Sequence, residues 1–155
     1  MLDLMSDTSI HVGSGTPIRS LECSMAVELR PIESLVGTEE VDSLAVERLA
    51  REIRSRGEWV APIPIECHLG LVMDGNHRLE AAKLLGLIRV PCCPLSYYDG
   101  RVSVACWESE TPFPVERIVA IAIHRRLLPY KSTRHRFEPN LPTVAIRLAE
   151  LLAAA

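Results

Sequence analysis

The segment that most constrains this chain is a polar run at residues 74–78 (DGNHR), which separates two apolar stretches. Residues 71–73 before it have the composition of a strand, and residues 79–85 after it carry apolar side chains at helical spacing. Gly75 allows a sharp turn that brings exposed backbone N–H groups to the start of a helix. Because a helix start offers unpaired donors and a partial positive charge, this order of strand, loop and helix suits a phosphate.

The side chains of the run add further polar groups. His77 and Arg78 are donors, and the forked guanidinium of Arg78 matches phosphate oxygens. Asp74 either caps the helix or holds a metal ion that is itself bound to the phosphates. The alternative is that Asp74 is only an N-cap and that the other two are ordinary surface residues. The density of polar residues between two apolar segments favours the functional interpretation.

Strand and helix patterns alternate irregularly along the chain, which indicates an α+β fold. We expect strands at residues 26–29, 63–66, 71–73, 88–93 and 102–107, with Pro94 ending the strand at 88–93. We expect helices around residues 46–57, 115–127 and 143–152, and a further helix that the run at 74–78 opens and Gly86 ends. We expect a polar, basic loop at 129–142. Residues 1–20 have no hydrophobic periodicity, so we expect a flexible lead-in there and one domain over residues 21–155.

Composition narrows the class of protein. A length of 155 residues and a hydrophobic fraction of 48% predict a single core, and with only 5% aromatic residues that core should be aliphatic. The chain has 17 Lys and Arg against 20 Asp and Glu, which gives a net charge of −3. This charge argues against a protein that binds DNA over its whole surface. No apolar run approaches the ~20 residues of a membrane span, and the first residues do not read as a secretory signal.

The cysteines indicate a reducing compartment. There are five of them, an odd number with no CxxC pair: Cys23, Cys67, Cys92, Cys93 and Cys106. We interpret them as reduced thiols that pack mostly as small apolar residues, which is typical of a cytoplasmic protein.

The polar run belongs to a longer pattern. Residues 71–78, then Ala81-Ala82, Leu85-Gly86 and Val90-Pro91, resemble the signature of the ParB/sulfiredoxin superfamily. The resemblance implies that Gly75, Asn76, His77 and Arg78 bind nucleotide phosphates. Sulfiredoxins carry a catalytic cysteine where this chain has Asn76, so that chemistry is absent. Partition-type ParB proteins carry an acidic–arginine–arginine variant followed by a helix-turn-helix, and this chain has no clear helix-turn-helix.

Two more segments resemble a third branch, the free serine kinases, which include enzymes of siderophore pathways. Residues 104–107 resemble a strand that ends in a Trp near the substrate, and residues 129–137 resemble a Pro-x-Lys-Thr-Thr-Arg-His loop. The resemblance runs from about residue 26 to residue 152 but lacks most of an inserted segment between these two motifs. It implies that the amino-acid substrate is held by Trp107, Lys131, Ser132, Thr133, Arg134 and His135.

Glu39 and Glu40 precede the first long helix. From the residues alone, two acids near a helix start are explained by favourable electrostatics. The free serine kinases place a catalytic Glu just ahead of that helix, so the resemblance implies that Glu39 is the base, with Glu40 as the neighbouring candidate. It also implies Asp74 as a second catalytic residue and possible Mg²⁺ ligand, with ATP or ADP as phosphate donor.

A basic stretch near the C-terminus allows two interpretations. Residues 117–137 contain no Asp or Glu but carry Arg117, Arg125, Arg126, Lys131, Arg134 and Arg136. One interpretation is a patch that binds DNA; the other is a clamp for a substrate carboxylate and nucleotide phosphates. We expect a kinase for free L-serine or a close hydroxy amino acid. The alternative is a ParB-like, nucleotide-binding protein that associates with DNA or has a regulatory role, and that does not turn over a small molecule.

Overall fold

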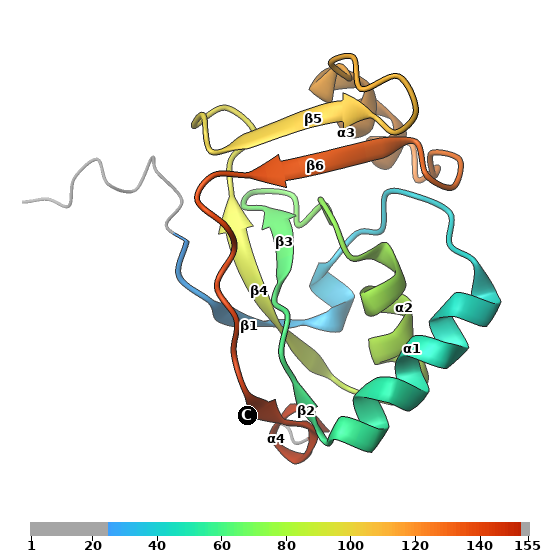
Figure 1. Ribbon diagram of the computed structural model, residues 1–155, viewed down its shortest axis with the longest axis vertical. Coiled ribbons are helices and arrows are strands. Elements are labelled where there is room, and N and C mark those ends of the chain that lie inside the picture. Colours follow the sequence, from blue (N-terminus) through green and yellow to red (C-terminus); the bar gives the residue numbers. More distant parts are fainter. Residues whose placement is uncertain (1–24, 153–155) are drawn as a thin grey trace, which may run out of the picture.

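A three-stranded sheet lies at the centre of the computed structural model, which describes residues 25–152 (Figure 1). β4 (Arg89–Leu95) is its middle strand, antiparallel to β1 (Glu28–Pro31) and parallel to β3 (Ile63–Glu66). The expected strand at 63–66 is confirmed, whereas β1 begins two residues later than expected. The lead-in expected at residues 1–20 lies outside the described residues.

β4 continues through a proline that we expected to end it. Pro94 pairs with Ile65 of β3, but the ladder with β1 covers only residues 89–92. Pro94 therefore has a paired strand on one side only, and a missing N–H is tolerated where no second strand needs it. The expectation that Pro94 ends the strand is wrong for this reason.

Two helices pack together on one side of this sheet (Figure 1). α1 (Ser43–Arg56) begins at Asp42, whose carboxylate accepts the Leu44 N–H, and ends at Gly57 in the left-handed conformation (φ 80°). α2 (Asn76–Leu84) starts immediately after Gly75. The ends of α1 follow from local sequence, because an N-capping Asp favours the start of a helix and a glycine in the left-handed conformation favours its end.

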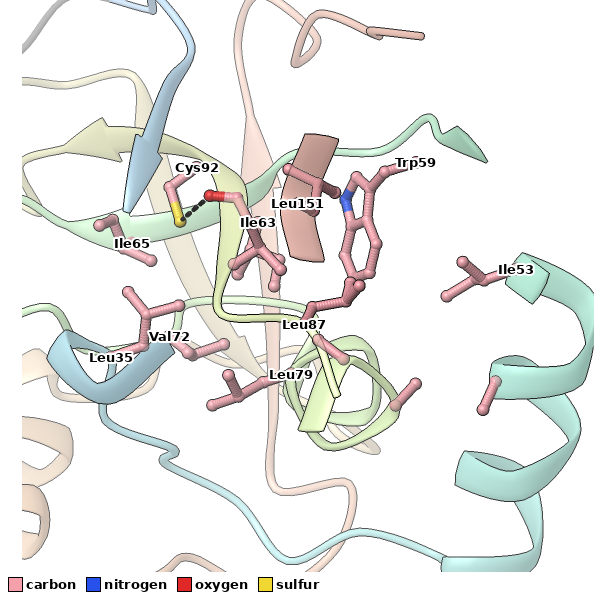
Figure 2. Close-up of a cluster of buried hydrophobic side chains, with 14 of the residues drawn as sticks. Leu35, Ile53, Trp59, Ile63, Ile65, Val72, Leu79, Leu87, Cys92 and Leu151 are labelled. Carbon is pink, nitrogen blue, oxygen red and sulfur yellow. Dashed lines mark hydrogen bonds between the residues drawn. The ribbon is translucent and has the colours of Figure 1, made fainter. Parts of the chain in front are cut away.

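The main core lies between α1, α2 and the sheet and is largely aliphatic, with one buried indole (Figure 2). Trp59, only 2% exposed, packs in it and donates its Nε1–H to the Ala61 carbonyl at 2.7 Å. Trp59 lies on β2 (Glu58–Trp59), which pairs with β7 (Ile146–Arg147) ahead of α4 (Leu148–Leu152). The helix expected over residues 143–152 is therefore wrong in its first half, because β2 holds residues 146–147 extended.

A two-stranded sheet crosses the end of the central sheet in Figure 1. β5 (Val102–Cys106) pairs there with β6 (Thr133–Phe137), antiparallel, and α3 (Val115–Ile123) lies between them in sequence. The polar loop expected at 129–142 is wrong over these five residues, since pairing with β5 makes a polar segment extended. α3 ends at Ile123, four residues before the end expected at residue 127. Arg125, two residues after the helix, has the left-handed backbone conformation (φ 57°).

The mixture of helices and small sheets in one compact unit confirms the α+β fold class. A second apolar cluster, which includes Leu95, Tyr97, Ile118 and Leu128, joins β4 to β5, β6 and α3. No helix within residues 25–152 has the length and apolar character that crossing a bilayer requires.

Candidate active site

A cavity of about 670 Å³ lies where the start of α2 meets β6 and the segment before α1. Every predicted site residue except Ser132 lines it: Glu39, Asp74, Gly75, Asn76, His77, Arg78, Trp107, Lys131, Thr133, Arg134 and His135. The fold thus brings together four segments of the chain, the first and last of which, at Glu39 and His135, are 96 residues apart in sequence. Ser132 instead donates its hydroxyl to the Pro129 carbonyl (2.5 Å), which shapes the turn before β6.

Glu39 is tied to β6. Its Oε2 accepts the backbone N–H of Thr133 at 3.0 Å and the Thr133 hydroxyl at 2.5 Å. Thr133 is buried, so these bonds hold the carboxylate in one place at the wall of the cavity. Glu40 also lines the cavity, but its backbone N–H donates to the Leu128 carbonyl and its side chain is exposed.

Asn76 does not direct its amide oxygen toward the cavity. Its Oδ1 accepts the backbone N–H groups of Thr38 (2.8 Å) and Glu39 (3.3 Å), and its Nδ2 donates to the Thr38 hydroxyl (3.2 Å). What Asn76 offers a phosphate is its backbone N–H, because the first N–H groups of a helix have no intrahelical partner. Thr38 is a residue that the sequence reasoning missed, since a single Thr before two acids carries no distinctive pattern.

His77 contacts two elements. Its Nε2 accepts the Asp42 N–H at 3.1 Å, and its ring meets Tyr130 edge-on at 5.6 Å between centroids. A nitrogen that accepts a hydrogen bond carries no proton, so this geometry assigns the proton to Nδ1. Tyr130, 45% exposed, is a cavity residue that the sequence reasoning did not single out, although it lies inside the motif at 129–137.

The Arg78 guanidinium anchors the loop before α2 through hydrogen bonds to backbone carbonyls. Its Nη1 donates to the carbonyls of Ala61 (2.8 Å) and Pro62 (2.9 Å), and its Nη2 to the carbonyl of Asp74 (3.4 Å). Gly75 has φ 106°, and a Cβ at that position would lie 2.8 Å from Arg78 Nη2, so only glycine fits over the guanidinium. Burial lowers the pKa of Arg78, while the nearby Asp74 carboxylate acts in the opposite sense.

Asp74 is not the helix cap. Gly75 is the N-cap residue of α2, and no side chain caps this helix. The Asp74 side chain is 62% exposed at the cavity and lies 3.9 Å from Arg78. Within residues 25–152, the three neighbouring potential metal ligands are Glu66, at the end of β3, and Cys67 and His68, in the turn after it; Asp74 is not among them.

Two cationic side chains, those of Lys131 and Arg134, contact the same aromatic ring, that of Trp107, in the wall of the cavity. Arg134 lies 4.4 Å and Lys131 5.2 Å from the centre of the Trp107 ring, and Lys131 also lies 5.4 Å from that of Tyr130. Cation–π contact holds both side chains in place without neutralising them. This wall is therefore suited to an anionic group.

The basic stretch is divided by the fold. Of its cations, Lys131 and Arg134 line the cavity, whereas Arg136 pairs with Glu110 at 3.1 Å and Arg117 lies over the Phe113 ring at 5.4 Å. Besides Arg78, the positive charge at the cavity thus comes from Lys131 and Arg134, at the β6 end of the stretch.

His135 presents an uncharged imidazole to the cavity. Its Nε2 lies 3.0 Å from the Tyr97 hydroxyl, and burial lowers the pKa of His135 to about 4. Burial raises the pKa of Tyr97 well above its usual range, so the phenol keeps its proton, and the histidine tautomer sets which of the two groups donates in this bond. In either tautomer one ring nitrogen of His135 carries a proton and the imidazole is neutral rather than cationic.

This shift predicts a loss of stability in acid. The unfolded chain protonates His135 near pH 6.5 and the folded chain only near pH 4. The free energy of unfolding therefore falls as the pH drops from 6.5 to 4, by ~2–3 kcal/mol, since one pKa unit is ~1.4 kcal/mol. Urea unfolding between pH 4 and 8 measures it. His135→Gln should flatten this part of the profile and exposed His124→Gln should not; equal slopes in wild type and His135→Gln would contradict the assignment.

The sequence is similar to two kinds of curated protein; no protein-family model matches it. Over 80 residues, 49% of this chain, it is 31% identical to an ATP-dependent L-serine kinase of Desulfurococcus mucosus, and 34% identical to one of Staphylothermus marinus. Over 87 residues it is 29% identical to a ParB-like protein of Sulfolobus acidocaldarius. The matched residues span only 31%, 32% and 40% of these relatives' lengths.

Solved structures share the fold. A free serine kinase variant in complex with AMP matches 81% of this chain and 93% of its own, with a TM-score of 0.74 and 12% identity. Another variant, in complex with ADP, gives the same values. SbnI from Staphylococcus aureus, with a C-terminal truncation, matches 83% of this chain and 90% of its own with a TM-score of 0.70 and 13% identity. This chain therefore has the ParB/sulfiredoxin-like fold of the free serine kinases, and its sequence resembles theirs over about half of its length.

Proposed function

We propose that this protein is a nucleotide-dependent kinase that phosphorylates the hydroxyl of free L-serine, or of a close hydroxy amino acid, to give the O-phospho amino acid. The observation that carries the proposal is the single cavity that joins a carboxylate on Glu39, the helix start after Gly75 and the cations at Trp107. Base, phosphate site and anion clamp are the parts that phosphoryl transfer to an amino acid needs. The shared fold and the local similarity to L-serine kinases support it.

In the proposed reaction, Glu39 is the general base. The substrate oxygen attacks the terminal phosphorus, its proton passes to the Glu39 carboxylate, and the bond to the bridging oxygen breaks, releasing a nucleotide with one phosphate fewer. Both hydrogen bonds from Thr133 go to Oε2 of Glu39, which leaves Oε1 for the substrate hydroxyl. ATP would yield ADP, and ADP would yield AMP.

The phosphates would lie on the start of α2. The backbone N–H groups of Gly75, Asn76 and His77 are the proposed donors, together with the partial positive charge of the helix. Arg78 acts by holding the loop. Asp74 fits a Mg²⁺ ion, because it places an exposed carboxylate beside this helix start; when bound, Mg²⁺ supplies positive charge to the phosphates.

The amino acid would lie against β6 and Trp107. Arg134 and Lys131 are the proposed partners of its carboxylate, Thr133 aligns Glu39, and neutral His135 forms a hydrogen bond with the substrate. Cys92, Cys93 and Cys106 carry free thiols, in accord with the cytoplasm as the proposed location.

Phosphorus NMR tests the proposal. The full chain is incubated with Mg²⁺, ATP or ADP, and one hydroxy amino acid at a time, with alanine as a control that lacks the hydroxyl. A phosphomonoester resonance that requires both the protein and L-serine, with loss of the terminal nucleotide resonance, is expected. Conversion of the nucleotide at the same rate with alanine, or none with any hydroxy amino acid, would overturn it.

Two observations favour a second candidate function, the ParB-like role. The Sulfolobus acidocaldarius relative is a ParB-like protein, and residues 117–137 are basic. A nucleotide-binding protein that associates with DNA would retard duplex DNA in an electrophoretic mobility-shift assay at physiological ionic strength. Its affinity for DNA would fall steeply with added salt. Such a shift without formation of phosphoserine would replace the kinase proposal.

Substitution of Arg134 tests the anion clamp. Arg134→Ala should raise the KM for the amino acid about 10- to 100-fold, because a hydrogen bond to a charged group is worth about 1.5–3 kcal/mol. The KM for the nucleotide should change by less than about twofold. Steady-state kinetics with each substrate varied in turn measures both values.

Arg136→Ala is the matched control for this clamp, because Arg136 lies two residues along β6, outside the cavity, and pairs with Glu110. It should leave both KM values unchanged. If Arg134→Ala weakens only nucleotide or DNA binding, the β6 wall does not bind the amino acid.

A further inference from the structure

A buried polar network joins the segment that carries Glu39 to the first residue of α2. Thr38, 5% exposed, donates its hydroxyl to the Val72 carbonyl at 2.8 Å and accepts the Asn76 Nδ2–H at 3.2 Å. Asn76 Oδ1 in turn accepts the N–H groups of Thr38 and Glu39. Both side chains are thereby engaged with each other and with the backbone on either side of the cavity.

The network ties the position of Glu39 to the start of α2. Asn76 is the first residue of α2, so its side chain reaches Glu39 from the same residue whose backbone N–H faces the proposed phosphates. The other contacts of Glu39 come from elsewhere: its carboxylate is held by Thr133, and its backbone forms a parallel bridge with Leu128. Without Asn76 and Thr38, no described hydrogen bond ties Glu39 to the start of α2.

We propose that Thr38 and Asn76 are positioning residues that hold the Glu39 carboxylate in register with a nucleotide bound at the start of α2. This inference rests on the proposed function and deepens it. A base must meet the substrate hydroxyl while that hydroxyl is in line with the phosphorus, and misplacement by about 1 Å can cost about 100-fold in rate. A link between the base and the phosphate site maintains that alignment.

Thr38 is the better position for the test because it lies outside the residues that line the cavity. Thr38→Val keeps the shape of the side chain and removes the hydroxyl, whereas Thr38→Ser keeps the hydroxyl. We expect Thr38→Val to lower kcat about 10- to 100-fold with the nucleotide Kd, measured by calorimetry, within about twofold of wild type. Thr38→Ser should restore kcat to within about threefold of wild type.

A measurement that needs no turnover separates this inference from the proposed function. Hydrogen exchange of the Glu39 amide, followed by NMR, reports whether Asn76 Oδ1 holds it. Exchange should accelerate at least about tenfold in Asn76→Ala, and to a lesser extent in Thr38→Val, with Thr38→Ser resembling wild type. Glu47, on the exposed face of α1, provides a reference amide whose exchange should stay unchanged.

The outcomes decide both questions. Faster exchange at Glu39 in Asn76→Ala, together with a wild-type protein that forms no phosphoserine, would overturn the proposed reaction while leaving the link intact. Unchanged exchange in Asn76→Ala, or a Thr38→Val enzyme with normal kcat, would overturn the positioning role. Loss of nucleotide affinity with normal kcat would also overturn it, because the network would then serve the loop alone. If Thr38→Val does not fold, Asn76→Ala carries both measurements.

Discussion

Glu39→Gln should abolish most turnover while leaving the protein folded and able to bind nucleotide. Glutamine keeps the size of the side chain and can still accept the hydrogen bonds from Thr133, but it cannot take a proton from the substrate. Loss of a general base typically lowers the rate by ~10²–10⁴-fold. We therefore expect kcat to fall by that factor, with the melting temperature within about 3 °C of wild type and the nucleotide Kd nearly unchanged.

Coupled assays of nucleotide release, thermal melts and calorimetry check the three parts of this prediction. Glu40→Gln distinguishes the two neighbouring carboxylates, and Glu47→Gln on the exposed face of α1 controls for loss of one negative charge. Full activity in Glu39→Gln, with or without loss in Glu40→Gln, would show that Glu39 is not the base. A large fall in melting temperature with normal kcat would instead make its contacts with Thr133 purely structural.

Arg78→Ala should lower both the stability of the protein and its affinity for nucleotide. The guanidinium bonds three backbone carbonyls, of Ala61, Pro62 and Asp74, and two of them lie in the segment that joins β2 to β3. Hydrogen bonds from charged groups contribute about 1.5–3 kcal/mol, and loss of the partner of the Pro62 carbonyl, which belongs to a buried residue, adds to the cost, whereas the Ala61 carbonyl keeps the Trp59 indole N–H. We expect the free energy of unfolding to fall by about 2–4 kcal/mol, measured by urea denaturation, with a weaker nucleotide Kd.

Two variants sharpen this prediction. Arg78→Lys keeps the charge but not the planar fork, so it should recover less than half of the lost stability. Arg51→Ala removes an exposed arginine from α1 and should change stability by less than about 0.5 kcal/mol. If Arg78→Ala unfolds like wild type yet no longer binds nucleotide, the side chain is a direct phosphate ligand, as the sequence pattern alone predicts.

Several elements were predictable because their causes are local. The end of α1 at Gly57 follows from helical spacing and a glycine with φ 80°, and the loop before α2 follows from one glycine between apolar segments. β3 is a short apolar run and was placed correctly. The same local rules failed for β6, whose polar residues resemble a loop until β5 pairs with them. They failed again at Pro94, where the outcome depends on which side of β4 is paired.

The sequence by itself predicted most of the polar residues that line the cavity, but not Tyr130, because the motifs at 74–78 and 129–137 carry a recognisable order of residue types. The tertiary structure alone decided what each side chain does there. Thr133 meets Glu39 across 94 residues, Asn76 turns back to Thr38, and Arg78 reaches the Ala61 carbonyl. Hydrogen-bond partners so distant in sequence leave no periodic pattern along the chain, since they arise only when the packed core brings separate segments within 3 Å or so of each other.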